Sequence, residues 1–298
     1  MITTSAPQED VRTGPRDRSG TPAGRQTSQD IRQRGKWPRF ILILLMTAVV
    51  LVPIVAVFGL SLTPSLGSNA EGLTFENFGN IFTQTAVLTW LGNSLVITAF
   101  TVVVAVAVAA PAGYVLSRAR NRLVSGYSLI LFVVQSLPVV TSAIPLFMLF
   151  ANLGLVDSLF GVVIIYVGAT MSVAIWMMAA YYDSIPIALE EAAWIDGASI
   201  FGSFTRIVLR NSLPGILSTA IFSFLLAWND YLIAVVFLRS DPNYTLPVGL
   251  ESFFQQNATN WGLVMAVAVV MMLPPIILFA FLNKYFSVGG IGGSLSSR

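Results

Sequence analysis

Six long apolar blocks constrain most strongly what this chain can fold into. A helix that crosses the hydrocarbon core of a bilayer needs about 20 predominantly apolar residues. Six segments satisfy this length, at about 40–62, 90–117, 127–151, 159–182, 213–238 and 261–286. Because lipid cannot hydrogen-bond to open backbone groups, each segment must be helical. The sequence therefore predicts an all-α, multi-pass protein of the cell membrane with six transmembrane helices.

Composition agrees with this prediction and narrows the chemistry. Of the 298 residues, 55% are hydrophobic and only 10% are charged, whereas soluble domains carry roughly 25% charged residues. The chain contains no histidine and no cysteine. Their absence removes histidine bases, cysteine nucleophiles, disulfides and the usual zinc ligands. We therefore expect no metal site and no catalytic residue.

The distribution of basic residues predicts the orientation in the membrane. With six spans, 15 of the 16 Lys and Arg residues fall on one side. Eight precede the first span, and the others lie in the second-to-third loop (Arg118, Arg120, Arg122), the fourth-to-fifth loop (Arg206, Arg210) and the C-terminal end (Lys284, Arg298). The opposite side has only Arg239. Under the positive-inside rule both termini are cytoplasmic.

Residues 1–36 differ from the remainder of the chain. They are rich in Arg, Gly, Pro, Ser and Thr, with little apolar surface to bury, so we expect a disordered basic cytoplasmic tail. Its arginines favour the orientation above and suit contact with anionic membrane lipids. The first apolar block is longer than the apolar core of a signal peptide, and no A-x-A cleavage site follows it. We therefore expect it to be an uncleaved first membrane helix. Residues 37–298 are then the six-span membrane domain.

The loop over residues 184–212 is the longest polar interruption in the second half. Asp183 and Ser184, followed by Pro186, predict a helix start. Gly197 predicts the end of that helix, since glycine tolerates left-handed backbone geometry. A second helix is expected from Ser199 to about Arg210.

Two interpretations of this loop remain open from its residues alone. Leu189, Ala192 and Ala193 share one face of the first helix, where small side chains admit the close approach of another protein, and the neighbouring acids can pair with its basic groups. Alternatively the loop lies in the lipid headgroup region. Its apolar anchors would then be Ile195, Phe201 and Phe204.

The spacing of the loop residues resembles a known motif. Glu191-Ala192-Ala193 is followed after three residues by Gly197, and after nine more by Ile207 and Leu209. This resembles the EAA loop, EAA-x3-G-x9-I-x-L-P, of permease subunits in binding-protein-dependent ABC importers. The longer phrase 189–198 is similar to the carbohydrate-type, MalG-like branch. Further similar phrases are Asn93-Ser94-Leu95, Trp228-Asn229-Asp230, 246–250 and Tyr285-Phe286, so the resemblance covers about 36–298.

The resemblance implies a fold and a function. The fold would be that of an ABC type I importer permease, whose membrane helices form the translocation pathway for a mono-, di- or oligosaccharide. The cytoplasmic loop would couple this pathway to a separate ATPase. The residues carried over to that coupling role are Glu190, Glu191, Ala192, Ala193, Asp196, Gly197, Ile207 and Leu209.

The resemblance also implies partners: two cytoplasmic ABC ATPase subunits, a second homologous permease subunit and an extracytoplasmic solute-binding protein, but no nucleic acid. The chain has no G-x-x-x-x-G-K-[ST] sequence. We therefore expect it to be no enzyme, with no cofactor of its own, and ATP and Mg to be bound by the ATPase. One position departs from the motif, because Arg210 replaces the final proline. We expect Arg210 to lengthen the second loop helix.

Asp230 is the one acid deep within a predicted span, where an ionisable residue suggests a function. With Asn229, Tyr231 and the aromatic face of Trp228, it offers groups that suit sugar hydroxyls and ring faces. The competing interpretation is an interhelical hydrogen bond. Gln135 is a weaker pathway candidate, as are Thr170 and Ser172, because single polar residues in spans usually serve packing.

Two other protein classes fit less well. An ion-gradient-driven secondary carrier or channel usually places several charged residues in its spans, and it leaves the EAA-like loop unexplained. A membrane enzyme without His or Cys needs a carboxylate pair or a Ser-Lys arrangement, and no predicted span offers either.

Overall fold

The computed structural model describes residues 36–64, 72–119, 121–137, 139–254 and 259–291, and the regular structure within these ranges is helical. The predicted disordered tail over 1–36 lies outside the described residues, except for Lys36, where the first helix begins. The chain divides into two compact units, Met1–Val55 and Ala56–Arg298. The first contains most of helix α2 (Lys36–Ser61), an apolar helix with Pro53 inside it.

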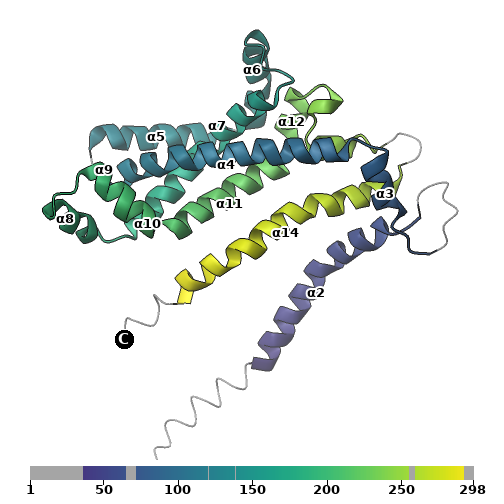
Figure 1. Cartoon of the computed structure of the whole chain (residues 1–298), viewed down its shortest axis with the longest axis horizontal. Helices are drawn as coiled ribbons and strands as arrows, with labels where there is room; N and C mark the ends of the chain where they lie inside the picture. The colour runs from purple at the N-terminus through teal and green to yellow at the C-terminus, as the bar shows by residue number, and fades with distance from the viewer. Residues whose placement is uncertain (1–35, 65–71, 120, 138, 255–258, 292–298) are drawn as a thin grey trace, which may run out of the picture. The chain divides into compact units, whose positions relative to one another are not determined.

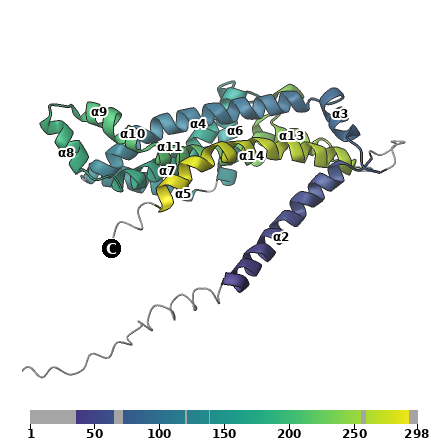
Figure 2. The same ribbon diagram turned by 60° about the horizontal axis from the view of Figure 1, so that its bottom comes forward.

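The second unit holds the other helices (Figures 1 and 2). In chain order they are α3 (Glu76–Thr83), α4 (Val87–Arg118), α5 (Arg122–Ser136), α6 (Val139–Asn152), α7 (Leu159–Asp183), α8 (Ala188–Ile195), α9 (Ile200–Ser203), the π-helical turn η1 (Phe204–Val208), α10 (Leu209–Asn211), α11 (Leu213–Asn229), α12 (Leu232–Phe237), the 3₁₀ turn η2 (Asp241–Asn243), α13 (Leu246–Glu251) and α14 (Trp261–Ile291).

Four helices are long and apolar enough to cross a membrane, namely α2, α4, α7 and α14, and the total reaches six if each of two bent helix pairs is one span. The prediction of an all-α membrane protein is therefore confirmed, and six is the upper count in the described residues. One pair is α5 with the part of α6 from Thr141, where the chain bends by 100°; the other is 200–211 with α11, where it bends by 75°.

Two predicted spans are interrupted, where the sequence suggested continuous helices. The predicted span 127–151 is divided between α5 and α6. At the break Leu137 has an extended backbone, ψ 122°, as expected for a residue that precedes proline. The predicted span 213–238 is divided between α11 and α12 at Asp230 and Tyr231.

Helix α4 packs along α7, and α11 lies against both (Figure 1). Glycine makes these approaches close: a Cβ atom at Gly113 on α4 would come within 2.7 Å of the Met178 Cβ on α7, and one at Gly215 on α11 would overlap the Tyr181 ring. A buried apolar cluster continues this packing into the loop after α7. Val208 of η1 belongs to it, with no exposed surface. The second loop helix is therefore part of the core of this unit.

The start of α4 holds the segment that follows α12. The Trp90 indole N–H donates to the Asp241 carbonyl (3.1 Å), and the Asn93 amide donates to the carbonyl oxygens of Pro242 (2.8 Å) and Tyr244 (2.9 Å). The Leu246 N–H donates to the Ser94 hydroxyl (2.8 Å). Two phrases that lie far apart in the sequence, 93–95 and 246–250, thus meet in space.

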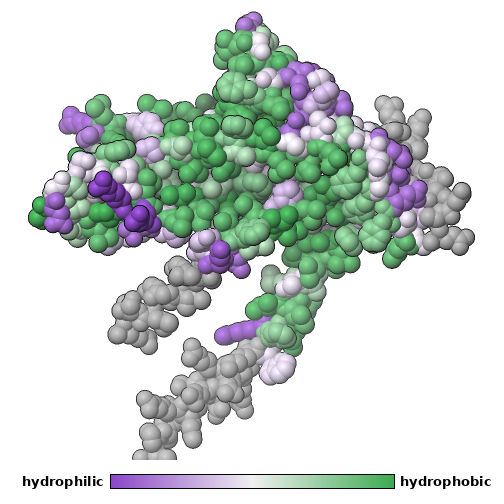
Figure 3. Space-filling model, viewed as in Figure 1, coloured by the Kyte–Doolittle hydropathy of each residue, from purple (hydrophilic) through white to green (hydrophobic). Residues whose placement is uncertain are grey.

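Apolar side chains cover most of the helical surface of the second unit in Figure 3. Hydrophilic residues gather in separate groups, one at the α8–α9 end and others beside α12 and near α3 (Figures 1 and 3). This distribution fits a protein whose middle contacts lipid or other apolar helices.

Candidate functional site

The first loop helix, α8, begins later than the sequence suggested. Ser184 is the C-cap of α7, and its hydroxyl donates to the Tyr181 carbonyl (2.6 Å). Asp183 is the last residue of α7, so neither side chain caps the loop helix. Helix α8 starts at Ala188 after a turn that contains Pro186. The predicted start was wrong because both polar residues serve the end of the preceding helix.

The predicted end of α8 is confirmed. Gly197 has a φ of +86°, in the left-handed region that favours glycine. Its N–H donates to the Trp194 carbonyl (3.0 Å), and the Ala198 N–H donates to the Ala193 carbonyl (2.9 Å). This is the hydrogen-bond pattern of a Schellman cap. Gly197 therefore sets the angle at which the chain leaves α8.

The second loop helix runs as predicted, but with a widened middle. It starts at Ser199, whose hydroxyl accepts from the Gly202 N–H (3.1 Å) as an N-cap. A π-helical turn that includes Ile207 follows α9, and α10 continues to Asn211. The helix passes through Arg210, in agreement with the expectation for that position. Short π-helical segments are frequent at functional sites.

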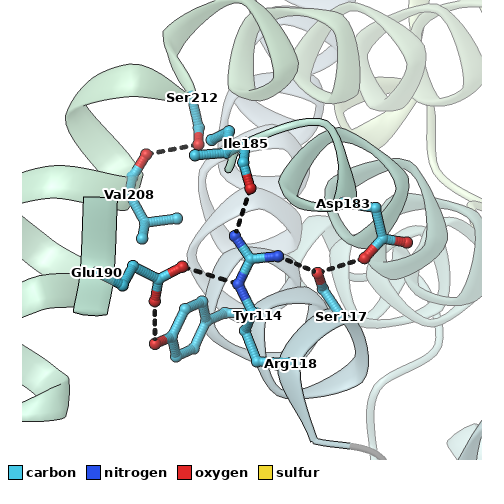
Figure 4. A network of polar contacts seen from close by, with 8 residues as sticks. All are labelled: Tyr114, Ser117, Arg118, Asp183, Ile185, Glu190, Val208 and Ser212. Carbon is cyan, nitrogen blue, oxygen red and sulfur yellow. Dashed lines mark hydrogen bonds and ion pairs between the residues drawn. The ribbon is translucent and has the colours of Figure 1, made fainter. Parts of the chain in front are cut away.

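The two adjacent acids of α8 point in different directions. Glu191 is exposed, whereas Glu190 has no exposed surface and is the one buried residue of this eight-residue helix. The Arg118 Nε donates to Glu190 Oε1 (2.7 Å), and the Tyr114 hydroxyl donates to Glu190 Oε2 (2.6 Å). Both carboxylate oxygens of Glu190 are thus engaged by the last turn of α4 (Figure 4).

Arg118 joins three helix ends. Besides Glu190, its guanidinium donates to the Ile185 carbonyl in the turn after α7 (3.1 Å) and to the Ser117 hydroxyl (3.1 Å). The Ser117 hydroxyl in turn donates to the Asp183 carboxylate at the end of α7 (2.6 Å). Figure 4 shows Arg118 at the centre of this network, between α4, the α7–α8 turn and α8. The sequence motif identified Glu190 but gave no signal for Arg118 or Tyr114 as its partners.

The outward surface of the loop combines apolar and acidic groups. Ile195 is 87% exposed and Phe201 is 75% exposed, and Leu189 and Trp194 are also exposed. The predicted coupling residues Glu191, Ala192, Asp196 and Gly197 are exposed, Ala193 is half-buried, and Ile207 and Leu209 are half-buried in the second loop helix. The structure therefore places most of the motif on one accessible loop, with Glu190 turned inward.

Phe204 does not fit the alternative in which it anchors the loop in lipid headgroups. It is only 7% exposed. Its ring packs on Tyr114 (centroids 4.7 Å apart) and lies edge-on to Tyr182 (6.3 Å). Ile195 and Phe201 are exposed, as the headgroup interpretation requires.

Asp230 lies at the break between α11 and α12. Its Oδ2 accepts from the Tyr166 hydroxyl on α7 (2.7 Å) and from the backbone N–H groups of Ile233 (3.0 Å) and Ala234 (3.2 Å). Asp230 thus links two helices and satisfies the first turn of α12. The interhelical hydrogen bond, one of the two interpretations above, is present, and the helix cap adds a role that the sequence did not indicate.

The neighbours of Asp230 lie in different surroundings. Trp228 is 1% exposed, stacks on Phe224 and donates its indole N–H to the Met271 carbonyl (3.1 Å). It therefore offers no free aromatic face in this conformation. Asn229 is exposed, and Tyr231 donates its hydroxyl to Glu251.

Gln135 lies apart from this group. It is exposed on α5 and lines a cavity of about 330 Å³ between α5, α6 and α7, together with Ser142 and Ser172. The lining is otherwise apolar, and it does not include Asp230 or its neighbours. Thr170 is buried and donates to the Tyr166 carbonyl one turn earlier (2.9 Å), which is an internal packing role. Among the described residues, no group of three acids could hold a metal ion.

The arrangement defines a class: a helical membrane protein with a structured loop that presents a short capped helix outward. Residues 109–288 match the family described as the binding-protein-dependent transport system inner membrane component. The chain belongs to this family of ABC importer permease subunits. It is a multi-pass component of the cytoplasmic membrane, it is not an enzyme, and it works in a binding-protein-dependent system with ATPase partners. Membership of this family excludes the alternative class, an ion-gradient-driven secondary carrier or channel.

Characterised relatives cover most of the chain. The maltodextrin transport system permease protein MalD of Streptococcus pneumoniae is 34% identical over 224 residues, which are 74% of this chain and 79% of the relative. The melibiose/raffinose/stachyose import permease protein MelC of Bacillus subtilis is 30% identical over 264 residues, covering 85% and 96%. The inner membrane ABC transporter permease protein YcjP of Escherichia coli K12 is 33% identical over 226 residues, covering 74% and 81%.

A solved structure shares the fold. One chain of a bacterial ABC transporter involved in the import of the acidic polysaccharide alginate aligns with a TM-score of 0.70 over 90% of this chain and 100% of that chain, at 24% identity. This likeness supports the permease fold.

Proposed function

We propose that this chain forms part of the translocation pathway for a neutral carbohydrate and is driven by ATP hydrolysis on a partner. The sugar class rests on the relatives whose names specify maltodextrin and melibiose, raffinose or stachyose. The observation that carries the coupling role is the exposed, Gly197-capped helix α8, with acidic and apolar groups facing outward.

In this proposal the coupling surface consists of Leu189, Glu191, Ala192, Ala193, Asp196 and Gly197. An ATPase subunit binds this surface on the cytoplasmic side. Small residues allow that subunit to approach the α8 backbone, and the exposed carboxylates pair with its basic side chains. ATP and Mg²⁺ bind to the ATPase and not to this chain.

The complete assembly in this proposal contains two ATPase copies, this subunit, a second homologous permease and an external solute-binding protein. The subunit has six spans with both termini in the cytoplasm, as the distribution of Lys and Arg favours. The segment after α12, held to α4 by Trp90 and Asn93, then lies outside, where the solute-binding protein docks.

The pathway candidates in this proposal are Asn229, Asp230 and Tyr231 at the α11–α12 break, and Gln135 across the α5–α7 cavity. Irregular backbone at membrane depth is tolerated where it is buried in protein or lines a cavity. The break supplies polar groups at such a point. Trp228 supports this region from within the core.

Uptake by the purified complex tests the proposed function. The complex would be reconstituted in liposomes with its solute-binding protein and assayed with labelled saccharides. We expect accumulation only when the ATPase sites have access to ATP and Mg²⁺. Accumulation that persists without nucleotide, or ATP-driven uptake of a non-carbohydrate solute but of none of the saccharides, would contradict it.

A further inference from the structure

Glu190 and Glu191 carry the same side chain but have different surroundings, which points to different roles. Glu191 is exposed and available to a partner, whereas Glu190 is inaccessible to any docked protein because it has no exposed surface. The motif resemblance assigned both acids to the coupling surface. The structure separates them.

Glu190 is the one buried residue of α8. The other residues of this helix are exposed or half-buried, so the Glu190 carboxylate is its one side-chain group fully enclosed by protein. That carboxylate meets α4 through Arg118 (2.7 Å) and Tyr114 (2.6 Å). A displacement of α8 therefore reaches the end of α4 directly, through two charge-assisted hydrogen bonds.

The C-terminal end of α4 is placed to transmit such a displacement to other helices. Arg118 is the last residue of α4, a helix of 32 residues that packs along α7 and α11. Because Arg118 also holds the Ile185 carbonyl and, through Ser117, the Asp183 carboxylate, α4, α7 and α8 meet at one guanidinium (Figure 4).

Glu190 is fully buried and the Arg118 side chain is 16% exposed, and an ion pair with so little contact with water contributes little to stability alone. Desolvation of two charges offsets much of their attraction, and apolar residues of similar size often stabilise as well or better. An ion pair with further hydrogen-bond donors instead holds its two partners in a defined geometry. That property suits a contact in which α8 and the end of α4 must move together.

We propose that the Tyr114/Arg118–Glu190 contact is the link that transmits movement of α8 to α4, while Glu191 serves docking. The inference rests on the proposed coupling function and deepens it. Glu190, Arg118 and Tyr114 are positioning residues in this account, and none of them touches the cargo or the nucleotide.

The test compares two isosteric variants of adjacent acids in the reconstituted complex. Glu190→Gln removes the charge that Arg118 pairs with. Glu191→Gln is the matched control at an exposed site. For Glu190→Gln we expect assembly and ATP hydrolysis to persist but uptake per ATP hydrolysed to fall by about tenfold, within the usual range of coupling between sites. For Glu191→Gln we expect weaker binding of the ATPase subunit but an unchanged ratio of uptake to ATP hydrolysed.

A purely structural role of Glu190 would lower the yield of complex without changing the ratio in what remains. If Glu190→Gln does not assemble, Tyr114→Phe decides, because it removes one hydrogen bond and keeps the ring that packs on Phe204. A lowered ratio in that variant supports the link. A wild-type ratio in Glu190→Gln, or in Tyr114→Phe where only that variant assembles, would overturn it.

A second measurement separates this inference from the proposed function. Stimulation of ATPase activity by the solute-binding protein requires a signal through the permease but no knowledge of the cargo. We expect Glu190→Gln to reduce that stimulation. Failure of the proposed function has a different signature, since the wild-type complex would then take up no saccharide with ATP.

Discussion

At the scale of single residues, a few side chains and one glycine decide how the loop is presented. Gly197 supplies a left-handed backbone and Glu190 supplies the buried contact. Their neighbours Glu191, Ala192 and Asp196 remain exposed. In the proposed coupling role, the exposed residues therefore matter as much as the packed one.

Substitution of Gly197 tests the cap. A Cβ atom there would meet nothing within 4 Å, so the intrinsic cost of Gly197→Val is backbone strain at φ +86°, about 1–2 kcal/mol. We expect the complex to assemble and uptake to be lost, because the end of α8 rotates away from its docked position. Uptake in proteoliposomes measures this.

Gly197→Asn is the control, since asparagine tolerates the left-handed region. Retained uptake in Gly197→Asn with loss in Gly197→Val would assign the effect to backbone geometry. Loss in both would instead indicate that the docked partner approaches the Gly197 Cα closely. Normal uptake by Gly197→Val would remove this residue from the mechanism.

At the scale of elements, short helices depend on single polar residues for their termini. Asp230 satisfies two backbone N–H groups at the start of α12 and binds Tyr166 of α7. The break at Asp230 divides a span that the sequence pattern shows as continuous. Polar groups that the break frees are thus bonded within the protein, as membrane depth requires.

Two substitutions at Asp230 separate its roles. Asp230→Ala removes the cap, and we expect a loss of about 0.5–2 kcal/mol in stability, seen as a lower melting temperature in detergent. Asp230→Asn keeps a capping acceptor and should melt near the wild type. If Asp230→Asn assembles normally but loses uptake, its charge acts in the pathway; wild-type uptake would restrict Asp230 to a structural role.

At the scale of the whole second unit, Asp157 fastens the α6–α7 turn to the segment after α12. Its Oδ1 accepts from the backbone N–H groups of Arg239 (2.9 Å) and Ser240 (3.0 Å), and its carbonyl accepts from the Asn243 amide (2.7 Å). Asp157 adopts a φ of +57°, which aspartate tolerates better than most residues. Two loops separated by about 80 residues in the sequence are thereby joined.

This joint has a predicted pH dependence. Desolvation acts to raise the pKa of Asp157, but hydrogen bonds from Ser240, Arg239 and Asn243 outweigh it and lower the pKa to about 2. Because the folded-state pKa is below the unfolded value, the stabilisation is complete above about pH 4 and is lost as the pH falls towards 2.

Melting temperatures of wild type and Asp157→Asn, measured from pH 6 down to the lowest pH the detergent complex tolerates, test this dependence. We expect wild type to melt higher at pH 6 and the difference to shrink below about pH 4. A difference that stays constant across this range would show that the carboxylate charge is not what holds the two loops.

Several features follow from the sequence alone. Apolar block lengths specify a helical membrane protein, because the bilayer sets a minimum length and requires internal hydrogen bonding. The Glu191-to-Leu209 spacing identified the permease family, and Gly197 marked the end of α8. These are local properties, which depend on residues within a few turns of one another.

Only the tertiary structure decided the rest. Whether Glu190 or Glu191 is buried depends on where Tyr114 and Arg118 of α4 lie, some 70 residues earlier in the chain. Likewise, the sequence does not distinguish Trp228 from a pathway residue, whereas in the fold its indole N–H donates to a carbonyl of α14. The sequence also does not show that Ser184 ends α7 instead of starting the loop helix. A side chain's partners across the fold are set by helix packing, which periodicity does not encode.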